Sequence, residues 1–158
     1  MTVAEVPPTS GRKTLMVCGG AHALHDGFTD LLNVLYPLLQ AQFGLSYAAI
    51  GALKAVYSGA MASGQIPSGW LAGKLGGVHV LAFGTALIAV GYGVAGLTGS
   101  LYGVIAGLLL AGLGGSTQHP IASTLVSGAY PGLRSRTALG TYNFTGDVGK
   151  VALPALLH

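Results

Sequence analysis

Five long apolar runs, each close to the length of a membrane-spanning helix, limit most strongly how this chain can fold. A spanning helix needs about 20 mostly apolar residues. The runs occupy residues 14–40, 48–71, 78–97, 101–126 and 137–157. Residues 1–12 are polar, and we expect them to form a flexible cytoplasmic tail. The pattern therefore predicts an all-α membrane protein in which residues 13–158 form the helical bundle.

The composition points to lipid as the surrounding solvent. Only 7% of the 158 residues are charged and 51% are hydrophobic, whereas a soluble domain carries about 25% charged residues. Such a chain cannot cover a soluble globule with polar surface, and it is too apolar for a disordered chain. Its 27 glycines fit membrane helices, because small residues let neighbouring helices approach closely.

The basic residues between the runs predict how the chain is oriented. Arg12 and Lys13 precede the first run, Lys74 follows the second, and Arg134 and Arg136 follow the fourth. The other two turns contain no Lys or Arg. The positive-inside rule then places the N-terminus in the cytoplasm and the C-terminus outside the inner (cell) membrane. The net charge of +3 therefore does not indicate a nucleic-acid partner.

Ionisable side chains inside the apolar runs are the main functional signal. Such residues are costly in lipid and face either a water-filled cavity or one another. They are His22, His25, Asp26 and Asp30 in the first run, Lys54 in the second, His119 in the fourth, and Asp147 and Lys150 in the fifth. The third run has none beyond His79 at its edge. We therefore expect four of the five helices to line a polar interior.

Helical spacing groups these side chains on the first helix. His22, Asp26, Asp30 and Asn33 follow one another by four or three residues, so they form one stripe. Antiparallel folding is expected to bring Lys54 to the depth of Asp30. The carboxylates of Asp26 and Asp30 are candidates for a proton or substrate-coupling site. The alternative for each is a structural hydrogen bond to a neighbouring helix. Lys54 either binds an anionic substrate, offsets Asp30 or extends to the membrane surface.

The other candidates carry similar alternatives. His22 is favoured for a role in the cavity, while for His25 a simple interhelical hydrogen bond is an equal reading. His119 and Asp147 are both expected near mid-membrane. The residue after His119 is Pro120, so this motif either kinks the helix or offers a free carbonyl as a binding point. Asp147 and Lys150, three residues apart, are expected to neutralise each other rather than contact substrate directly.

Metal and enzyme chemistry find little support in these residues. The side chains of His22, His25, Asp26 and His119 are suitable donors, but they show no distinctive ligand spacing. We expect no metal site and no cofactor. Cys18 is the only cysteine, which leaves no partner for an internal disulfide. The chain also has no phosphate-binding loop and no nucleophile elbow, so we do not expect an enzyme.

Three segments resemble one group of transporters. The stretch "AHALHDGFTDLLNVLYPLLQAQFGLSYAAIGAL" resembles the first helix and loop of major facilitator superfamily transporters of the fosmidomycin-resistance type, with His22 and Asp26 matching the His-x-x-x-Asp pattern. "GLGGSTQHPIASTL" is similar to the small-residue run of the group that ends in His-Pro, and "GTYNFTGDVGKVALPALL" resembles the antiporter helix of drug exporters. The resemblance implies proton-coupled alternating access that moves a small solute or drug, most simply by efflux.

The loop after the second run also resembles the superfamily, with one departure. In "GWLAGKLGG", Gly69, Lys74 and Gly76 match the cytoplasmic gating loop. Gly73 stands where the family pattern has an Asp that helps to lock the gate. Ile121 similarly replaces an acidic residue that often follows His-Pro.

The resemblance also implies a longer protein. Full transporters of this type have twelve spans in two halves built from inverted repeats, and five are predicted here. We therefore expect the front portion of a transporter, with a complementing chain or further sequence supplying the other helices. The alternative is a non-transporting accessory subunit or an inactive truncated fragment. The expected partners are a small-molecule substrate, a proton and the lipid bilayer.

Overall fold

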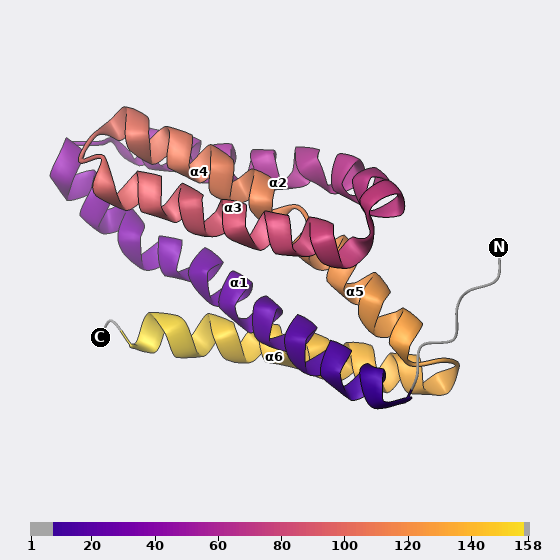
Figure 1. Cartoon of the computed structure of the whole chain (residues 1–158). Coiled ribbons are helices and arrows are strands. Elements are labelled where there is room, and N and C mark those ends of the chain that lie inside the picture. Colours follow the sequence, from indigo (N-terminus) through magenta and orange to yellow (C-terminus); the bar gives the residue numbers. More distant parts are fainter. Residues whose placement is uncertain (1–7, 157–158) are drawn as a thin grey trace.

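The computed structural model describes residues 8–156, and its secondary structure over that range is entirely α-helical (Figure 1). The helices are α1 (Pro8–Phe43), α2 (Tyr47–Leu75), α3 (Gly77–Leu97), α4 (Leu101–Gly115), α5 (Gln118–Ala129) and α6 (Leu133–Ala155). Together α4 and α5 follow the fourth predicted run, so the six helices correspond to the five predicted runs. The all-α prediction is confirmed. Of the predicted tail, residues 1–12, residues 1–7 lie outside the described residues, whereas residues 8–12 are helical because α1 begins at Pro8.

Local sequence explains where the helices begin and end. The Ser46 hydroxyl accepts a hydrogen bond from the Ala49 amide at 3.2 Å at the start of α2. Ser100 caps α4 in the same way through the Gly103 amide, at 3.1 Å. Such caps satisfy amides that have no partner inside the helix. Gly76 separates α2 from α3 with φ of 88°, a conformation that favours glycine.

The fourth span breaks because of Pro120. A proline has no amide hydrogen, so the carbonyl four residues earlier, that of Ser116, loses its helical partner. The Ser68 hydroxyl on α2 shares its hydrogen between this carbonyl, at 3.2 Å, and the Gln65 carbonyl of its own helix, at 2.9 Å. The Thr117 hydroxyl bonds back to the Gly114 carbonyl at 2.9 Å. The structure thus supports the kink reading of the His-Pro motif, and the freed carbonyl is already occupied by a serine.

Small residues allow the close helix contacts. A β-carbon on Gly91 of α3 would lie 2.6 Å from the Gly107 carbonyl oxygen of α4. About two helical turns earlier on α3, a β-carbon on Gly84 would lie 2.7 Å from the carbonyl oxygen of Gly114. Glycine at these positions lets the two backbones touch. Figure 1 shows α3 and α4 side by side along their length.

The first and last helices form a second close pair. A β-carbon on Gly19 of α1 would meet Thr145 of α6, and one on Gly27 would meet Leu153. The later residue of α1 thus meets the later residue of α6, so the two helices run in the same direction. They lie side by side in Figure 1. This pairing brings polar residues of both helices to the same depth.

Two apolar clusters flank that depth. One lies around α1, α3, α5 and α6 and contains Cys18, Val80, Leu81, Ile121, Ala122, Val126, Ala138 and Tyr142. The other lies around α1, α2 and α4 and contains Leu32, Tyr36, Leu53, Tyr57, Val104, Leu108 and Ala111. On α1, the buried polar residues fall between Cys18 and Leu32. Within the described range, Gly77–Leu97 and Leu101–Ala129 are long and apolar enough to cross a membrane.

Candidate functional site

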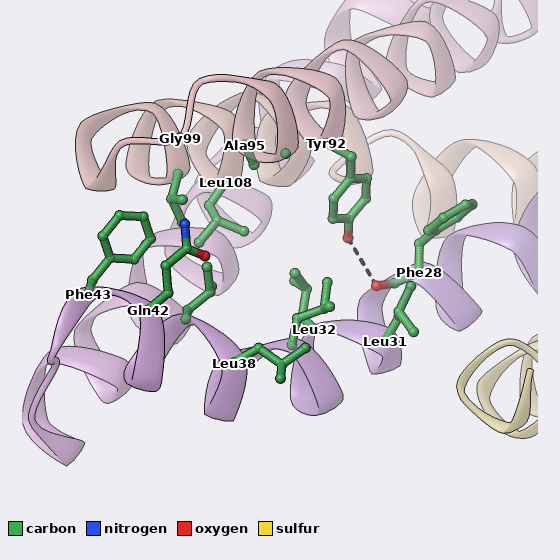
Figure 2. Close-up of a pocket in the computed structure, with 14 residues that line it drawn as sticks. Phe28, Leu31, Leu32, Leu38, Gln42, Phe43, Tyr92, Ala95, Gly99 and Leu108 are labelled. Atoms are coloured by element: carbon green, nitrogen blue, oxygen red, sulfur yellow. Dashed lines mark hydrogen bonds between the residues drawn. The ribbon is translucent and has the colours of Figure 1, made fainter. Parts of the chain in front are cut away.

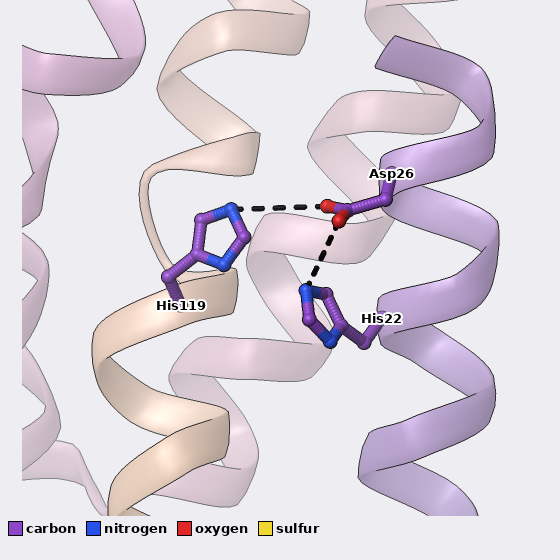
Figure 3. Close-up of side chains that lie close together, drawn as sticks. All are labelled: His22, Asp26 and His119. Atoms are coloured by element: carbon purple, nitrogen blue, oxygen red, sulfur yellow. Dashed lines mark ion pairs between the residues drawn. The ribbon is translucent and has the colours of Figure 1, made fainter. Parts of the chain in front are cut away.

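Asp26 of α1 is the centre of a charged cluster (Figure 3). One carboxylate oxygen, Oδ2, lies 3.2 Å from Nε2 of His22 and 3.2 Å from Nζ of Lys150. The other, Oδ1, lies 3.8 Å from Nε2 of His119. Only 5% of Asp26 is exposed. We call His22, Asp26, His119 and Lys150 the Asp26 cluster; it joins α1, α5 and α6.

His22 is held in one orientation from two sides. It precedes Asp26 by one helical turn, as the sequence pattern predicted. Its Nδ1 lies 3.0 Å from the carbonyl oxygen of Tyr142, and its ring stacks on the Tyr142 ring at 4.2 Å. A carbonyl can only accept, so Nδ1 carries the hydrogen and Nε2 is left to face Asp26.

Three imidazoles gather at this point. The His119 ring meets the His22 ring edge to face at 5.1 Å and the His25 ring at 5.4 Å. His25 is buried, and its Nδ1 has no hydrogen-bond partner within residues 8–156. It therefore takes part through ring contacts rather than through a hydrogen bond at that nitrogen. The side chain of His119 is 44% exposed, so it lies on the open side of the cluster.

Lys150 connects the cluster to Asp147. Its Nζ lies 3.0 Å from Oδ1 of Asp147, the pair predicted from the spacing on α6. The prediction of self-neutralisation is incomplete, because the same ammonium also reaches Asp26. Glycines make this possible: a β-carbon on Gly146 would lie 2.7–2.8 Å from atoms of His22 and Asp26.

Comparison with known proteins identifies the family. The sequence profile of the Major Facilitator Superfamily matches residues 18–157. This chain belongs to the Major Facilitator Superfamily. It is also 28% identical over 156 residues to the fosmidomycin resistance protein of Escherichia coli (strain K12), a match that covers 97% of this chain and 38% of that protein. No solved structure gives a significant match. The resemblance read from the first helix is confirmed, and the chain is that of a multi-pass membrane protein.

Two of the predicted site residues of this superfamily member lie apart from the Asp26 cluster. Asp30 is half-buried, and its Oδ1 accepts a hydrogen bond from the side-chain amide Nδ2 of Asn33 at 3.2 Å. Lys54 is exposed, next to the buried stripe of α2 that contains Leu53 and Tyr57. Neither residue makes an ion pair within the described part of the chain. The expected compensation of Asp30 by Lys54 is not found, because Lys54 projects from the face of α2 beside the buried one.

The predicted gating-loop residues of this superfamily member have identifiable local roles. Nζ of Lys74 lies 3.8 Å over the ring of Trp70, a cation–π contact. Gly76 provides the turn between α2 and α3, and Gly69 is exposed with open space around it. Their participation in gating stays a prediction.

Sequence reasoning missed two uncharged residues of the site. Tyr142 stacks on His22, and Gln118 is 1% exposed beside the kink. Only one sequence signal pointed to Tyr142: it precedes Gly149 by seven residues, as Tyr57 precedes Gly64. Both tyrosines are buried.

An apolar groove lies on the other side of α1 (Figure 2). A cavity of about 370 Å³ between α1, α3 and α4 is lined by residues such as Leu32, Leu38 and Phe43. A second cavity of about 330 Å³ shares Phe28 and Tyr92 with it and reaches His25. The Tyr92 hydroxyl donates to the Phe28 carbonyl at 3.2 Å where the two cavities meet. The groove thus follows α1 from His25, beside the Asp26 cluster, to Phe43.

Proposed function

We propose that this chain is part of a secondary active transporter that moves a small solute or drug out of the cell by proton-coupled alternating access. The Asp26 cluster is the observation that carries this proposal. Membership of the Major Facilitator Superfamily supports transport rather than an enzymatic reaction. The name of the bacterial relative, a fosmidomycin resistance protein, supports efflux.

The proton is assigned to the contact between His22 and Asp26. With the hydrogen of His22 committed to the Tyr142 carbonyl through Nδ1, the atoms Nε2 and Oδ2 attract each other only when one further proton sits on either group. Gain or loss of that proton changes the charge of a cluster that links α1 to α5 and α6. A proton that binds one arrangement of these helices better than another shifts the population between them.

The solute is assigned to the open side of the same cluster. The side chains of His119 and Lys150 are both 44% exposed, whereas that of Asp26 is 7% exposed. A small anionic solute can therefore reach the His119 imidazole and the Lys150 ammonium without displacing the Asp26 carboxylate from the protein interior. An anion and Asp26 would compete for Lys150, which couples solute binding to the state of the carboxylate.

The protein is proposed to lie in the inner membrane with its N-terminus in the cytoplasm, on the strength of the positive-inside pattern. The chain spans 38% of the length of the curated relative that it matches. Further helices, from a longer protein or from a complementing chain, are proposed to cover the groove between α1 and α3. Asp30, Lys54 and the loop residues Gly69, Lys74 and Gly76 are kept as secondary candidates for the pathway and its gate.

The test is solute flux driven by an imposed pH gradient in vesicles that contain the complete protein. Replacing Asp26 with Asn keeps the shape and removes the charge, and it is expected to abolish gradient-driven flux. His79→Gln, on the exposed edge of α3, is the control and should transport normally. Unchanged flux in Asp26→Asn would remove Asp26 from the mechanism. Absence of flux in the unaltered protein and in both variants, with normal folding, favours a non-transporting subunit.

A further inference from the structure

The Asp26 cluster contains a set of atoms that suits a transition-metal ion. One ring nitrogen of His22, one ring nitrogen of His119 and a carboxylate oxygen of Asp26 all lie within 4.8 Å of one another. Imidazole nitrogens together with a carboxylate oxygen are ligands for zinc, nickel and copper. These three residues come from α1 and α5, which explains why spacing along the sequence did not reveal them.

The separations are close to those of a tetrahedral site. With metal–ligand bonds of about 2.0–2.2 Å, neighbouring ligand atoms of a tetrahedral zinc ion lie about 3.3 Å apart. Nε2 of His22 lies 3.2 Å from Oδ2 of Asp26, and Nε2 of His119 lies 3.8 Å from the other carboxylate oxygen, Oδ1. The Asp26 carboxylate must turn to present one oxygen to both rings, and His119, whose side chain is 44% exposed, must move inward.

The surroundings of His22 provide an independent indication. Its Nε2 is buried and has no hydrogen bond of good geometry to any described residue. Its Nδ1 donates to the Tyr142 carbonyl, and the ring stacks on Tyr142. A metal-ligating histidine is typically held in this way, because a hydrogen bond at one nitrogen directs the lone pair of the other toward the ion.

Lys150 opposes a cation at this place, and the structure shows how it can withdraw. Its ammonium lies 3.2 Å from Asp26 and 3.0 Å from Asp147. Asp147 is largely exposed and can keep the ammonium when Asp26 turns to an ion. The expected site is therefore one in which a metal and Lys150 compete for the same carboxylate.

We propose that His22, Asp26 and His119 bind a divalent transition-metal ion such as Zn²⁺. Two imidazole Nε2 atoms and one carboxylate oxygen are the protein ligands, and water completes the coordination. Such an ion would link α1 to α5 across the cluster. The proposal extends beyond transport and needs only binding to be measured, so it can fail or succeed separately from the proposed flux.

The experiment uses the complete protein in detergent, purified through a tag without histidine. Titration with Co²⁺ should give the visible absorption of a four-coordinate site at one ion per chain, and Zn²⁺ should displace it. His119→Ala is the decisive variant because this side chain is partly exposed, and it should weaken Zn²⁺ binding at least tenfold. His79→Ala, an exposed histidine outside the cluster, should bind as the unaltered protein does.

Lys150→Met provides a test of opposite sign. Removing the competing ammonium should strengthen Zn²⁺ binding about tenfold, which a merely structural role of the cluster would not produce. Asp26→Asn should weaken binding in the same range as His119→Ala. Binding that is absent, or that is the same in His119→Ala and Lys150→Met as in the unaltered protein, overturns the proposal. Binding lost in His79→Ala instead would identify an ion at the protein surface and overturn it as well.

Discussion

The ammonium of Lys150 on α6 lies 3.2 Å from the carboxylate of Asp26 on α1. This contact lies beside a close approach of the two helices, since a β-carbon on Gly149 of α6 would collide with the backbone of Ala23. The ion pair between Asp26 and Lys150 joins two helices that are far apart in the sequence. It therefore depends on Gly149, the glycine next to the lysine. The packing of α1 against α6 and the pairing of Asp26 with Lys150 are therefore linked.

Removing the lysine should destabilise the protein. Lys150→Ala leaves Asp26, a buried carboxylate, without its cationic partner. Breaking a fully buried pair costs about 3–5 kcal/mol, and exposed pairs contribute about 0–1 kcal/mol. Because Lys150 is partly exposed, we expect a loss of about 1–2 kcal/mol in the free energy of unfolding. Denaturant unfolding followed by circular dichroism in detergent measures it.

A double-mutant cycle separates the pair from its surroundings. Asp26→Asn should remove most of the effect of Lys150→Ala, with a coupling of about 1 kcal/mol. Lys54→Ala is the matched control for stability, because that lysine is exposed and unpaired in the described structure; its effect should stay within about 0.5 kcal/mol. Additive losses in the cycle would show that Lys150 stabilises α6 only through Asp147.

The second prediction concerns the contact between helices at Gly149. A β-carbon there would collide with the Ala23 backbone. Gly149→Ala must push α1 and α6 apart, and we expect a loss of about 1–3 kcal/mol, as for other overpacked sites. The melting temperature in detergent should fall accordingly.

Gly140 on the same helix is the control for that prediction. It has open space at its β-carbon position, so Gly140→Ala should be neutral or slightly stabilising through its better helix propensity. Equal effects of the two substitutions would mean that α1 and α6 are not in close contact at Gly149.

Much of the site was predictable because it depends on helical spacing. His22 and Asp26 lie one turn apart, and Asp147 and Lys150 nearly so, and both pairs form contacts. The kink at Pro120 was also predictable, because proline lacks an amide hydrogen wherever it stands. Such features need only the local geometry of an α-helix.

The remainder depends on how each helix is rotated and packed. Asp26 and Asp30 lie on one stripe, yet only Asp26 joins the cluster, because α6 approaches α1 at that depth. Lys54 has the charge to join but lies beside the buried face of α2. Which carboxylate meets which cation is fixed by close glycine contacts between helices, and no periodicity in a single run contains that information.

The last prediction tests orientation through one added cysteine in each variant. Cys18 is 3% exposed, so the unaltered protein should resist a membrane-impermeant maleimide and provide a silent background. The variants Leu75→Cys, at the last residue of α2, and Thr98→Cys, after α3, place exposed thiols at opposite ends of α3. With the N-terminus in the cytoplasm, Leu75→Cys should be labelled only in inside-out vesicles and Thr98→Cys only in right-side-out vesicles. The reverse pattern would invert the proposed orientation, since both thiols are read against the same background and only the side of the membrane differs.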